Sequence, residues 1–195
     1  MAFVVHYAVF GGPHRQIETL SRSLAAYGTD VCVVLPRRGG DAASRLARQG
    51  IEVRTLELSH VSKNISSLVD LARRLAGDVR ALAEVFREVG ADLVVVSGLH
   101  NPHGALAARR AELPVVWQVI DSNVPLPLGS WWLKHIVSRL ANHVMFWGPS
   151  LAEIFAAREI LGSTPYSSFW PSVSSLPMEM GSVPRHGLKV GMLAN

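Results

Sequence analysis

A short glycine loop between the first apolar run and the first helical pattern is the first place where chemistry could occur. It lies within residues 10–15, with Gly11, Gly12 and His14 as candidate ligand-binding residues. Glycines let the backbone approach a ligand closely, and free N–H groups at a helix start bind anions. The loop is neither a Gly-x-Gly-x-x-Gly fingerprint nor a Walker loop. It therefore indicates either an anion-binding loop or a tight turn without a ligand.

Polar residues also follow the fourth apolar run. His100, Asn101 and His103 could donate hydrogen bonds to phosphate or to sugar hydroxyl groups. The two histidines could instead hold a metal with a third ligand, but no carboxylate–histidine cluster matches them, so no metal is expected. The alternative is a polar loop that caps a helix, with Asn101 at the N-cap and Pro102 at the first helical position.

The loop after the fifth apolar run contains a carboxylate. Asp121 could accept a proton from a hydroxyl group or hold a sugar hydroxyl, with Ser122 beside it. An Asx turn leading into Pro125 explains the same residues without a function. Serine-based catalysis has no support, because no Gly-x-Ser-x-Gly run is present.

Two adjacent tryptophans, Trp131 and Trp132, fall within a helical pattern. Neighbouring residues of a helix cannot both face one core stripe, so we expect one of them to be exposed. The basic residues Lys134, His135 and Arg139 follow. An exposed tryptophan beside basic residues indicates a contact with a membrane surface, a platform for the acceptor, or packing against a neighbouring loop or domain.

Alternating strand and helix patterns separate these loops. Apolar runs rich in β-branched residues predict strands over residues 3–8, 31–35, 51–56, 92–96, 114–119 and 143–146. Apolar residues at helical spacing predict helices over 14–27, 41–49, 65–89, 102–111, 130–141 and from 150 onward. Repeated strand–helix units predict an α/β fold of the Rossmann-like type, an open parallel sheet with helices on both faces. Ligands of such sheets collect beyond the carboxyl ends of the strands, where these loops are expected.

The domain organisation changes near residue 162. One domain is expected over residues 1–162, followed by a linker rich in Pro, Ser and Gly over 163–187. A further apolar run begins in the last segment, 188–195. This run predicts either the first strand of another, missing domain or a final edge strand of the same sheet.

Composition excludes several classes of protein. Of the 195 residues, 49% are hydrophobic and 17% are charged, which excludes a disordered chain. The single cysteine, Cys32, excludes a disulfide framework and a cysteine-based zinc site. No apolar stretch approaches the ~18 residues of a membrane span and no secretory signal is visible, so a cytoplasmic protein is expected. The net charge of +4 comes mostly from arginines spread along the chain, which does not favour nucleic-acid binding.

Several short motifs, taken in order, resemble the N-terminal domain of family-4 glycosyltransferases of the GT-B fold. The first is a Gly-Gly loop that opens a helix, and the later ones are strand and helix segments in the order of the same template. Their residues are 11–28, 90–100, 104–109, 113–118, 169–173 and 188–195. The resemblance covers essentially the whole chain, and it implies one half of a two-domain fold.

The resemblance also implies an activity. The whole enzyme would transfer a sugar from a nucleotide-diphosphate sugar to a hydroxyl acceptor, with retention of configuration. This chain would be its acceptor-side half, and the missing C-terminal domain would bind the nucleotide-sugar donor. No metal or other cofactor is implied, because helix N-termini and basic residues hold the diphosphate in this fold. Without the donor half, the chain alone is expected to be inactive or nearly so.

By the same resemblance, the glycines at 11–12 would face the donor diphosphate, and the polar residues at 100–103 would line the acceptor side. Many relatives carry a histidine just after the fifth strand. This sequence has Ile120 there, followed by Asp121, which is therefore the candidate catalytic substitute.

Two other classes of function stay open. The chain could be a non-catalytic remnant or module that binds a second chain through its apolar run at 188–193. It could also be a different nucleotide-binding enzyme on the same fold, such as an epimerase or a reductase. The missing Gly-x-Gly-x-x-Gly fingerprint disfavours this last class.

Overall fold

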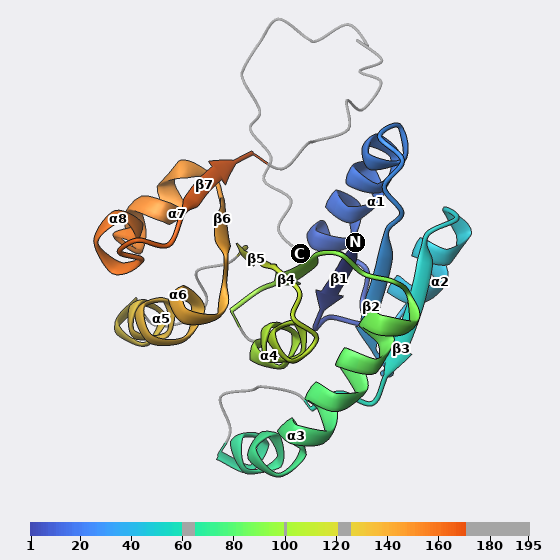
Figure 1. Cartoon of the computed structure of the whole chain (residues 1–195), viewed down its shortest axis with the longest axis horizontal. Coiled ribbons are helices and arrows are strands. Elements are labelled where there is room, and N and C mark those ends of the chain that lie inside the picture. The colour runs from blue at the N-terminus through green and yellow to red at the C-terminus, as the bar shows by residue number, and fades with distance from the viewer. Residues whose placement is uncertain (60–64, 100, 121–125, 171–195) are drawn as a thin grey trace, which may run out of the picture.

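The computed structural model describes residues 1–59, 65–99, 101–120 and 126–170 (Figure 1). Within them, seven parallel strands form one sheet in the order β3-β2-β1-β4-β5-β6-β7. The strands are β1 (Ala2–Val5), β2 (Cys32–Pro36), β3 (Glu52–Leu56), β4 (Val94–Ser97), β5 (Val115–Val119), β6 (His143–Trp147) and β7 (Tyr166–Phe169). The helices are α1 (Gly12–Ala25), α2 (Ala42–Arg48), α3 (Ile65–Glu88), α4 (Pro102–Arg110), α5 (Leu126–Trp132), α6 (Ser138–Leu140), α7 (Pro149–Ile154) and α8 (Ala157–Ile160), with a π-helical segment (Leu133–Val137) between α5 and α6.

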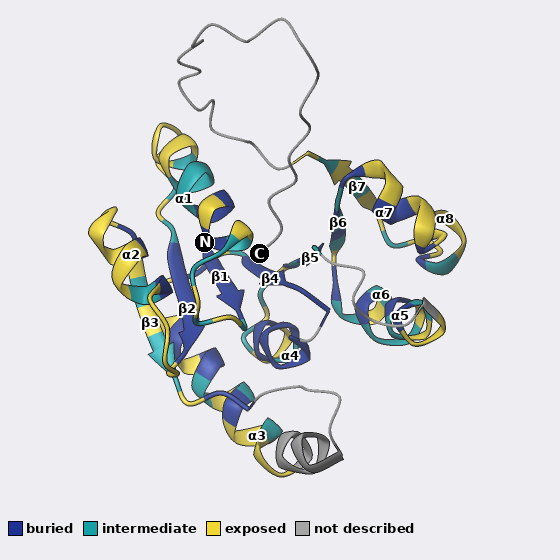
Figure 2. Ribbon diagram, turned by 180° about the vertical axis from the view of Figure 1, so that it is seen from behind, coloured by how far each residue is buried: buried dark blue, intermediate teal, exposed yellow. Residues whose placement is uncertain are grey.

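Both faces of the sheet are covered by helices, as near-continuous apolar strands predict. Successive residues of β1 face opposite sides, so that Ala2 and Val4 lie in one buried cluster while Phe3 and Val5 lie in the other. Helices α1 and α2 contribute to the cluster around Phe3, and the later helices contribute to the cluster around Val4 (Figure 1). Figure 2 shows the buried strands between helices whose outer faces are exposed. The predicted α/β fold, a Rossmann-like open parallel sheet, is confirmed.

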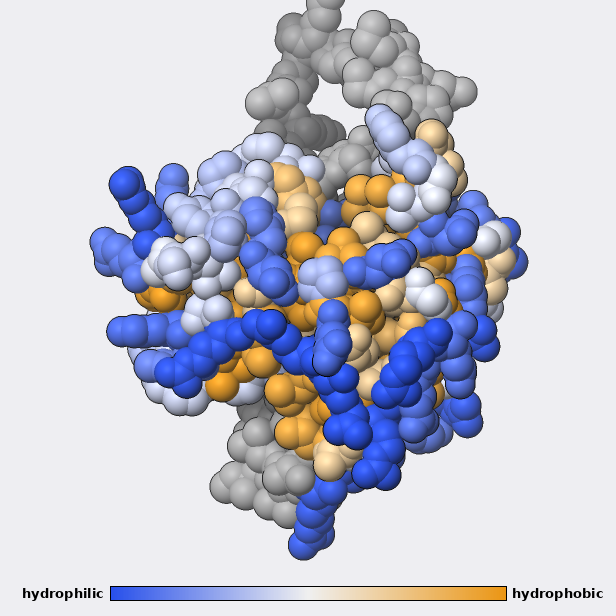
Figure 3. Space-filling view, viewed as in Figure 1, coloured by the Kyte–Doolittle hydropathy of each residue, from blue (hydrophilic) through white to orange (hydrophobic). Residues whose placement is uncertain are grey.

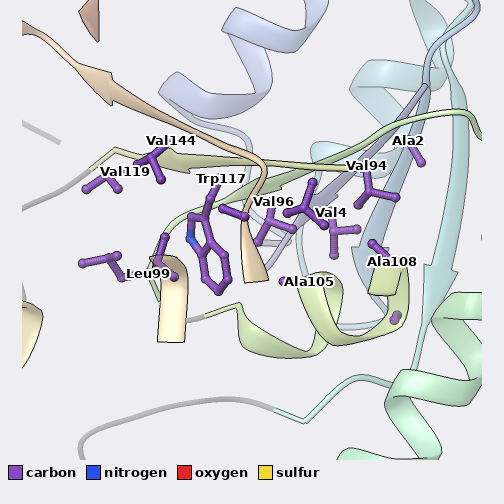
Figure 4. Packing of buried hydrophobic residues seen from close by; sticks show 14 of the residues in the cluster. Ala2, Val4, Val94, Val96, Leu99, Ala105, Ala108, Trp117, Val119 and Val144 are labelled. Atoms are coloured by element: carbon purple, nitrogen blue, oxygen red, sulfur yellow. The ribbon is translucent and has the colours of Figure 1, made fainter. Parts of the chain in front are cut away.

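Helix α4 lies close to the centre of the sheet because its sheet-facing residues are small. A Cβ atom at Gly104 would stand 3.2 Å from Cβ of Val4 and 3.3 Å from Cγ2 of Val96. Ala105 and Ala108 are fully buried beside it (Figure 4). This close approach fixes the start of α4, and the loop before it, relative to the ends of β1 and β4.

Strand β7 lies within the stretch that the sequence assigned to a linker from residue 163. It pairs with β6, from Val144 opposite Tyr166 to Trp147 opposite Phe169. The apolar pattern did not predict this strand, because a short edge strand that alternates exposed and half-buried residues needs no continuous apolar run. The linker prediction is therefore wrong for residues 166–169. The later part of the predicted linker, and the run at 188–195, fall outside the described residues.

The other expected strands and helices are present, with ends shifted by a few residues. The largest local difference lies between β5 and β6. There the helix begins at Leu126 rather than near residue 130, and it contains the π-helical segment Leu133–Val137. A single π turn inside a helix rotates the residues on either side of it relative to one another, which a 3.6-residue pattern does not predict.

Candidate functional site

Residues 6–9 leave β1 at the carboxyl edge of the sheet, and the glycine loop (residues 10–15) follows them and runs into the first turn of α1. Its shape is held by the buried ring of His14. Nε2 of His14 lies 3.0 Å from the carbonyl oxygen of Tyr7, and the N–H of Gly11 donates to Nδ1 at 3.1 Å. Because the Tyr7 oxygen can only accept, Nε2 carries the proton and the ring is neutral. Burial lowers the pKa of His14, which keeps it neutral.

The loop after β2 also holds the glycine loop. The N–H of Ala42 donates to the carbonyl oxygen of Ala8 at 3.0 Å, and the N–H of Phe10 donates to Oδ1 of Asp41 at 2.9 Å. The same Phe10 N–H holds the pKa of the Asp41 carboxyl below its usual value. A Cβ atom at Gly40 would stand 2.2 Å from the Ala8 oxygen, so only glycine permits this contact. The glycine loop is therefore fixed by the protein itself.

The fixed loop leaves the first turn of α1 open. A Cβ atom at Gly11 would meet nothing within 4 Å, and Gly12 is exposed. The first turn contains no acidic residue. The N–H of Gly11 is taken by His14 and residue 13 is a proline, so Gly12 offers a backbone donor in this turn. That donor and the positive end of the helix dipole favour an anion at this position. This geometry permits the diphosphate contact expected of Gly11 and Gly12. His14, by contrast, is buried with both ring nitrogens engaged, and its predicted contact with a substrate has no support from this geometry.

The carboxyl ends of β1, β4 and β5 meet at Gly98, whose φ is +86°. A Cβ atom there would stand 2.7 Å from Cε1 of His6 and 3.8 Å from Cδ1 of Ile120. Nδ1 of His6 lies 3.3 Å from the Ser97 carbonyl oxygen, and the indole N–H of buried Trp117 donates to the Gly98 oxygen at 3.1 Å. Glycine is required here by both the backbone conformation and the crowding.

The imidazole of His6 and the side chain of Ile120 thus both approach Gly98. His6 therefore lies near the position where the family resemblance leads one to expect a histidine. Sequence reasoning missed His6 as a site residue, because it assigned residues 3–8 to the first strand. The available signal was a polar side chain at the end of an apolar run. The strand ends at Val5, so His6 belongs to the loop.

Asn101 and His103 lie at the start of α4, and both are buried. The side-chain N–H of Asn101 donates to the Val4 carbonyl oxygen at 2.8 Å. Within the described part of the chain, neither ring nitrogen of His103 has a hydrogen-bond partner. Burial lowers the pKa of His103 to about 4, despite the opposing effect of the Asp78 carboxylate. The Asn101 side chain ties the start of α4 to the end of β1, and the expected contact of Asn101 and His103 with an acceptor stays a prediction.

His100, Asp121 and Ser122 fall outside the described residues, so their expected roles also stay predictions. The strands that precede them are neighbours in the sheet. Ser97 lies opposite Gln118, and its hydroxyl donates to Oε1 of Gln118 at 2.9 Å. No group of three metal-ligating side chains is found among the residues that the structure describes.

Aromatic side chains gather at the ends of β6 and β7. The ring of Trp147 lies 3.6 Å from the position of a Cβ at Gly12 and packs edge-on against Phe169, with centroids 6.3 Å apart. The ring of Trp170 covers Gly148 and is 73% exposed. The glycine loop is therefore bordered by the Trp147 ring on the β6 side.

Trp131 and Trp132 lie at the end of α5, and the structure confirms that only one of them is well exposed. Trp131 is 51% exposed, whereas Trp132 packs against the core. The Trp131 ring lies 5.2 Å from that of His135, and Leu128, one turn earlier, is also exposed. In the part of the chain that the structure describes, no helix is long and apolar enough to cross a membrane. The contact of this tryptophan pair with a membrane surface stays a prediction.

The family model of the glycosyl transferase 4-like domain matches residues 11–160, from the glycine loop to the end of α8. This range holds most of the sheet and its helices. The chain therefore belongs to the glycosyl transferase 4-like domain family, the N-terminal domain of GT-B glycosyltransferases. The expected family is confirmed. No curated protein matches the sequence.

Solved structures share the fold at low sequence identity. A glycosyltransferase from Rickettsia africae ESF-5 superposes with a TM-score of 0.63 at 16% identity, over 87% of this chain and 42% of that one. MurG from Acinetobacter baumannii gives 0.54 at 18% identity, over 77% and 42%. The UDP-GlcNAc 2-epimerase from Neisseria meningitidis, solved with UDP-GlcNAc, gives 0.54 at 14% identity, over 82% and 43%. The matched part of this chain therefore covers 42–43% of the length of these proteins.

Proposed function

We propose that this chain is the acceptor-side domain of a glycosyltransferase that moves a sugar from a nucleotide-diphosphate sugar to a hydroxyl acceptor. The observation that carries the proposal is the family match, which begins at Gly11 in the glycine loop and includes the open first turn of α1. A helix start of this kind supplies N–H groups to a diphosphate without a metal ion. The proposal therefore needs no cofactor besides the donor itself.

In the proposed enzyme, each site residue has a role that follows from the loop in which it lies. The first turn of α1, at Gly11 and Gly12, faces the donor diphosphate. His6, near Ile120, supplies a polar group at the end of β1, next to the place where the transferred sugar would lie. Asp121 is the candidate catalytic residue in the next loop. The acceptor lies along the same carboxyl edge.

A separate C-terminal domain would bring the donor. Transfer requires both substrates to be held together in one geometry, which turns a bimolecular encounter into a step within one complex. The chain alone is therefore expected to be inactive or nearly so. Joined to a donor-binding domain of the GT-B fold, in one polypeptide or as a second chain, it is expected to transfer sugar.

The test is a transfer assay with UDP- and GDP-sugars and a panel of hydroxyl acceptors, read as released nucleotide diphosphate. It is run on the 195-residue chain, and on the chain joined to a donor-binding domain. In the joined enzyme, Gly11→Val would fill the space in front of α1 and lower kcat/KM about tenfold or more. Gly39→Val is the matched control, because a Cβ atom there also meets nothing within 4 Å. Robust transfer by the chain alone, or equal activity of the two variants, would contradict the proposal.

A second candidate function comes from the shared fold. The UDP-GlcNAc 2-epimerase from Neisseria meningitidis superposes about as well as MurG. Epimerisation of UDP-GlcNAc, followed by NMR in the absence of any acceptor, distinguishes the two. Epimerised product without transfer would favour the epimerase, whereas copurification of a second chain without either activity would favour a partner-binding module.

A further inference from the structure

A pocket of about 470 Å³ opens between the end of β3 and the middle of α3. Because β3 ends at Leu56, the pocket lies at the same carboxyl edge of the sheet as the glycine loop. Three of its residues are arginines. One follows the end of β2, and the other two lie on α3, far from it in the sequence. The lining residues are Arg37, Leu56, Glu57, Arg73, Arg74, Gly77, Asp78 and Ala81.

Backbone carbonyl groups at the end of β3 orient two of the guanidinium groups. Nη2 of Arg37 donates to the Thr55 oxygen at 3.3 Å, and Nη2 of Arg74 donates to the Glu57 oxygen at 3.1 Å. Each of these groups keeps further N–H donors, since a guanidinium carries five. None of the ion pairs found among the described residues involves Arg37, Arg73 or Arg74. Among the described side chains, the three charges are thus gathered without a paired carboxylate.

The two acidic residues of the pocket do not cancel this charge. Oδ2 of buried Asp78 accepts hydrogen bonds from the N–H of Ser59, at 2.8 Å, and from its hydroxyl group. That carboxylate is therefore occupied within the protein. Glu57 is exposed and forms no ion pair in the described part of the chain. Three arginines against two carboxylates leave the pocket with a positive formal charge.

From this geometry we propose that the arginine pocket (Arg37, Arg73 and Arg74) binds a phosphate group carried by the acceptor. The planar fork of arginine matches the oxygens of a phosphate and binds them through paired hydrogen bonds. The pocket has room for a phosphate and part of the molecule attached to it, because a Cβ atom at Gly77 would meet nothing within 4 Å. Figure 3 shows strongly hydrophilic side chains gathered over α3. That the phosphate belongs to the acceptor rests on the proposed function, whereas phosphate binding itself does not.

The binding test uses the whole 195-residue chain and isothermal titration with inorganic phosphate and with sn-glycerol 3-phosphate. The test variant carries Arg73→Gln and Arg74→Gln. The control carries Arg80→Gln and Arg87→Gln, which remove the same charge from exposed positions of the same helix outside the pocket. We expect the test variant to bind about tenfold or more weakly, and the control to bind like the wild type. Circular dichroism checks that both variants fold.

A second binding experiment identifies the source of the phosphate. It measures binding of the chain to phosphatidylcholine vesicles that contain phosphatidic acid. Vesicle binding that is lost in the test variant assigns the pocket to a lipid headgroup, and tighter binding of sn-glycerol 3-phosphate than of phosphate assigns it to a soluble phosphomonoester. An absence of phosphate binding, or an equal loss in test and control variants, would overturn the pocket assignment. In the joined enzyme, equal transfer by test variant and wild type would overturn only the acceptor assignment and would leave the proposed function standing.

Discussion

His103 is buried to 1% exposure in the described structure, and neither of its ring nitrogens has a hydrogen-bond partner there. A buried imidazole without partners is stable only in its neutral form, because charging it would leave the charge without solvation. Its pKa of about 4, against 6.5 for an ordinary histidine, expresses this cost. In the unfolded chain the same ring is in water and titrates normally.

We therefore expect His103 to make the free energy of unfolding depend on pH. Because the folded pKa lies below the unfolded one, the unfolded state binds more protons between about pH 6.5 and pH 4. The stabilising contribution is complete above pH 6.5 and is lost as the pH falls towards 4. The whole shift corresponds to about 3 kcal/mol. Urea unfolding of the wild type and of His103→Leu, measured from pH 7 to pH 4, checks this.

The variant keeps every other titratable group, His14 included, so only the difference between the two curves is assigned to His103. The wild type should lose more stability than His103→Leu over this range. Parallel curves would mean that the ring is hydrated or protonated in the folded chain.

At the scale of elements, the packing of α4 on the sheet depends on Gly104. A Cβ atom there would stand 3.2 Å from Val4, which is fixed within the central strand. Gly104→Val is expected to lower the free energy of unfolding by about 2 kcal/mol, because α4 would have to move away from β1 and β4. Chemical denaturation measures this loss.

Gly77 on α3 is the matched control, since it is also a helical glycine but a Cβ atom there meets nothing within 4 Å. Gly77→Val should change the free energy of unfolding by less than about 0.5 kcal/mol, and in the stabilising direction. A similar loss for both variants would contradict this account, because helix propensity favours valine over glycine and contact with the sheet would then not distinguish the two positions.

Helices and strands could be predicted from the sequence where their burial requires a regular pattern of apolar residues. Strands covered on both faces, such as β2 and β4, form continuous apolar runs that are easy to find. β7 lies at the edge of the sheet, where alternating exposure weakens that pattern, and the prediction placed a linker there. The π turn before α6 is not predicted by a 3.6-residue apolar pattern.

The candidate site could be predicted less well, because its residues gain their roles from contacts distant in sequence. The glycine loop was identified by residue type alone. The sequence did not show that the His14 ring would bond within that loop, or that His6 would lie near Ile120. The arginine pocket could not be predicted from the sequence either, because Arg37 and Arg73 line one pocket only when α3 packs beside β3.

At the scale of the whole molecule, the glycine loop, the exposed Trp170 and the arginine pocket all lie at the carboxyl ends of parallel strands. In a parallel sheet these ends share one edge, so a single edge can hold both an anion at α1 and a second anion near α3. In the proposed enzyme, a donor-binding domain would close over the glycine loop, and the arginine pocket would hold the far end of the acceptor.

The strand order also governs how the chain reaches its fold. Of the neighbouring strand pairs, only β1 and β4 are separated by more than a single crossover: residues 6–93 lie between them, with Ala2 opposite Val94. Closing so long a loop is slower than forming local pairs. We therefore expect pulse-labelled hydrogen exchange to protect the amides of Cys32 and Val144 before that of Ala2, which bonds to Leu93. The centre of the sheet, its most deeply buried part, would be the last to form.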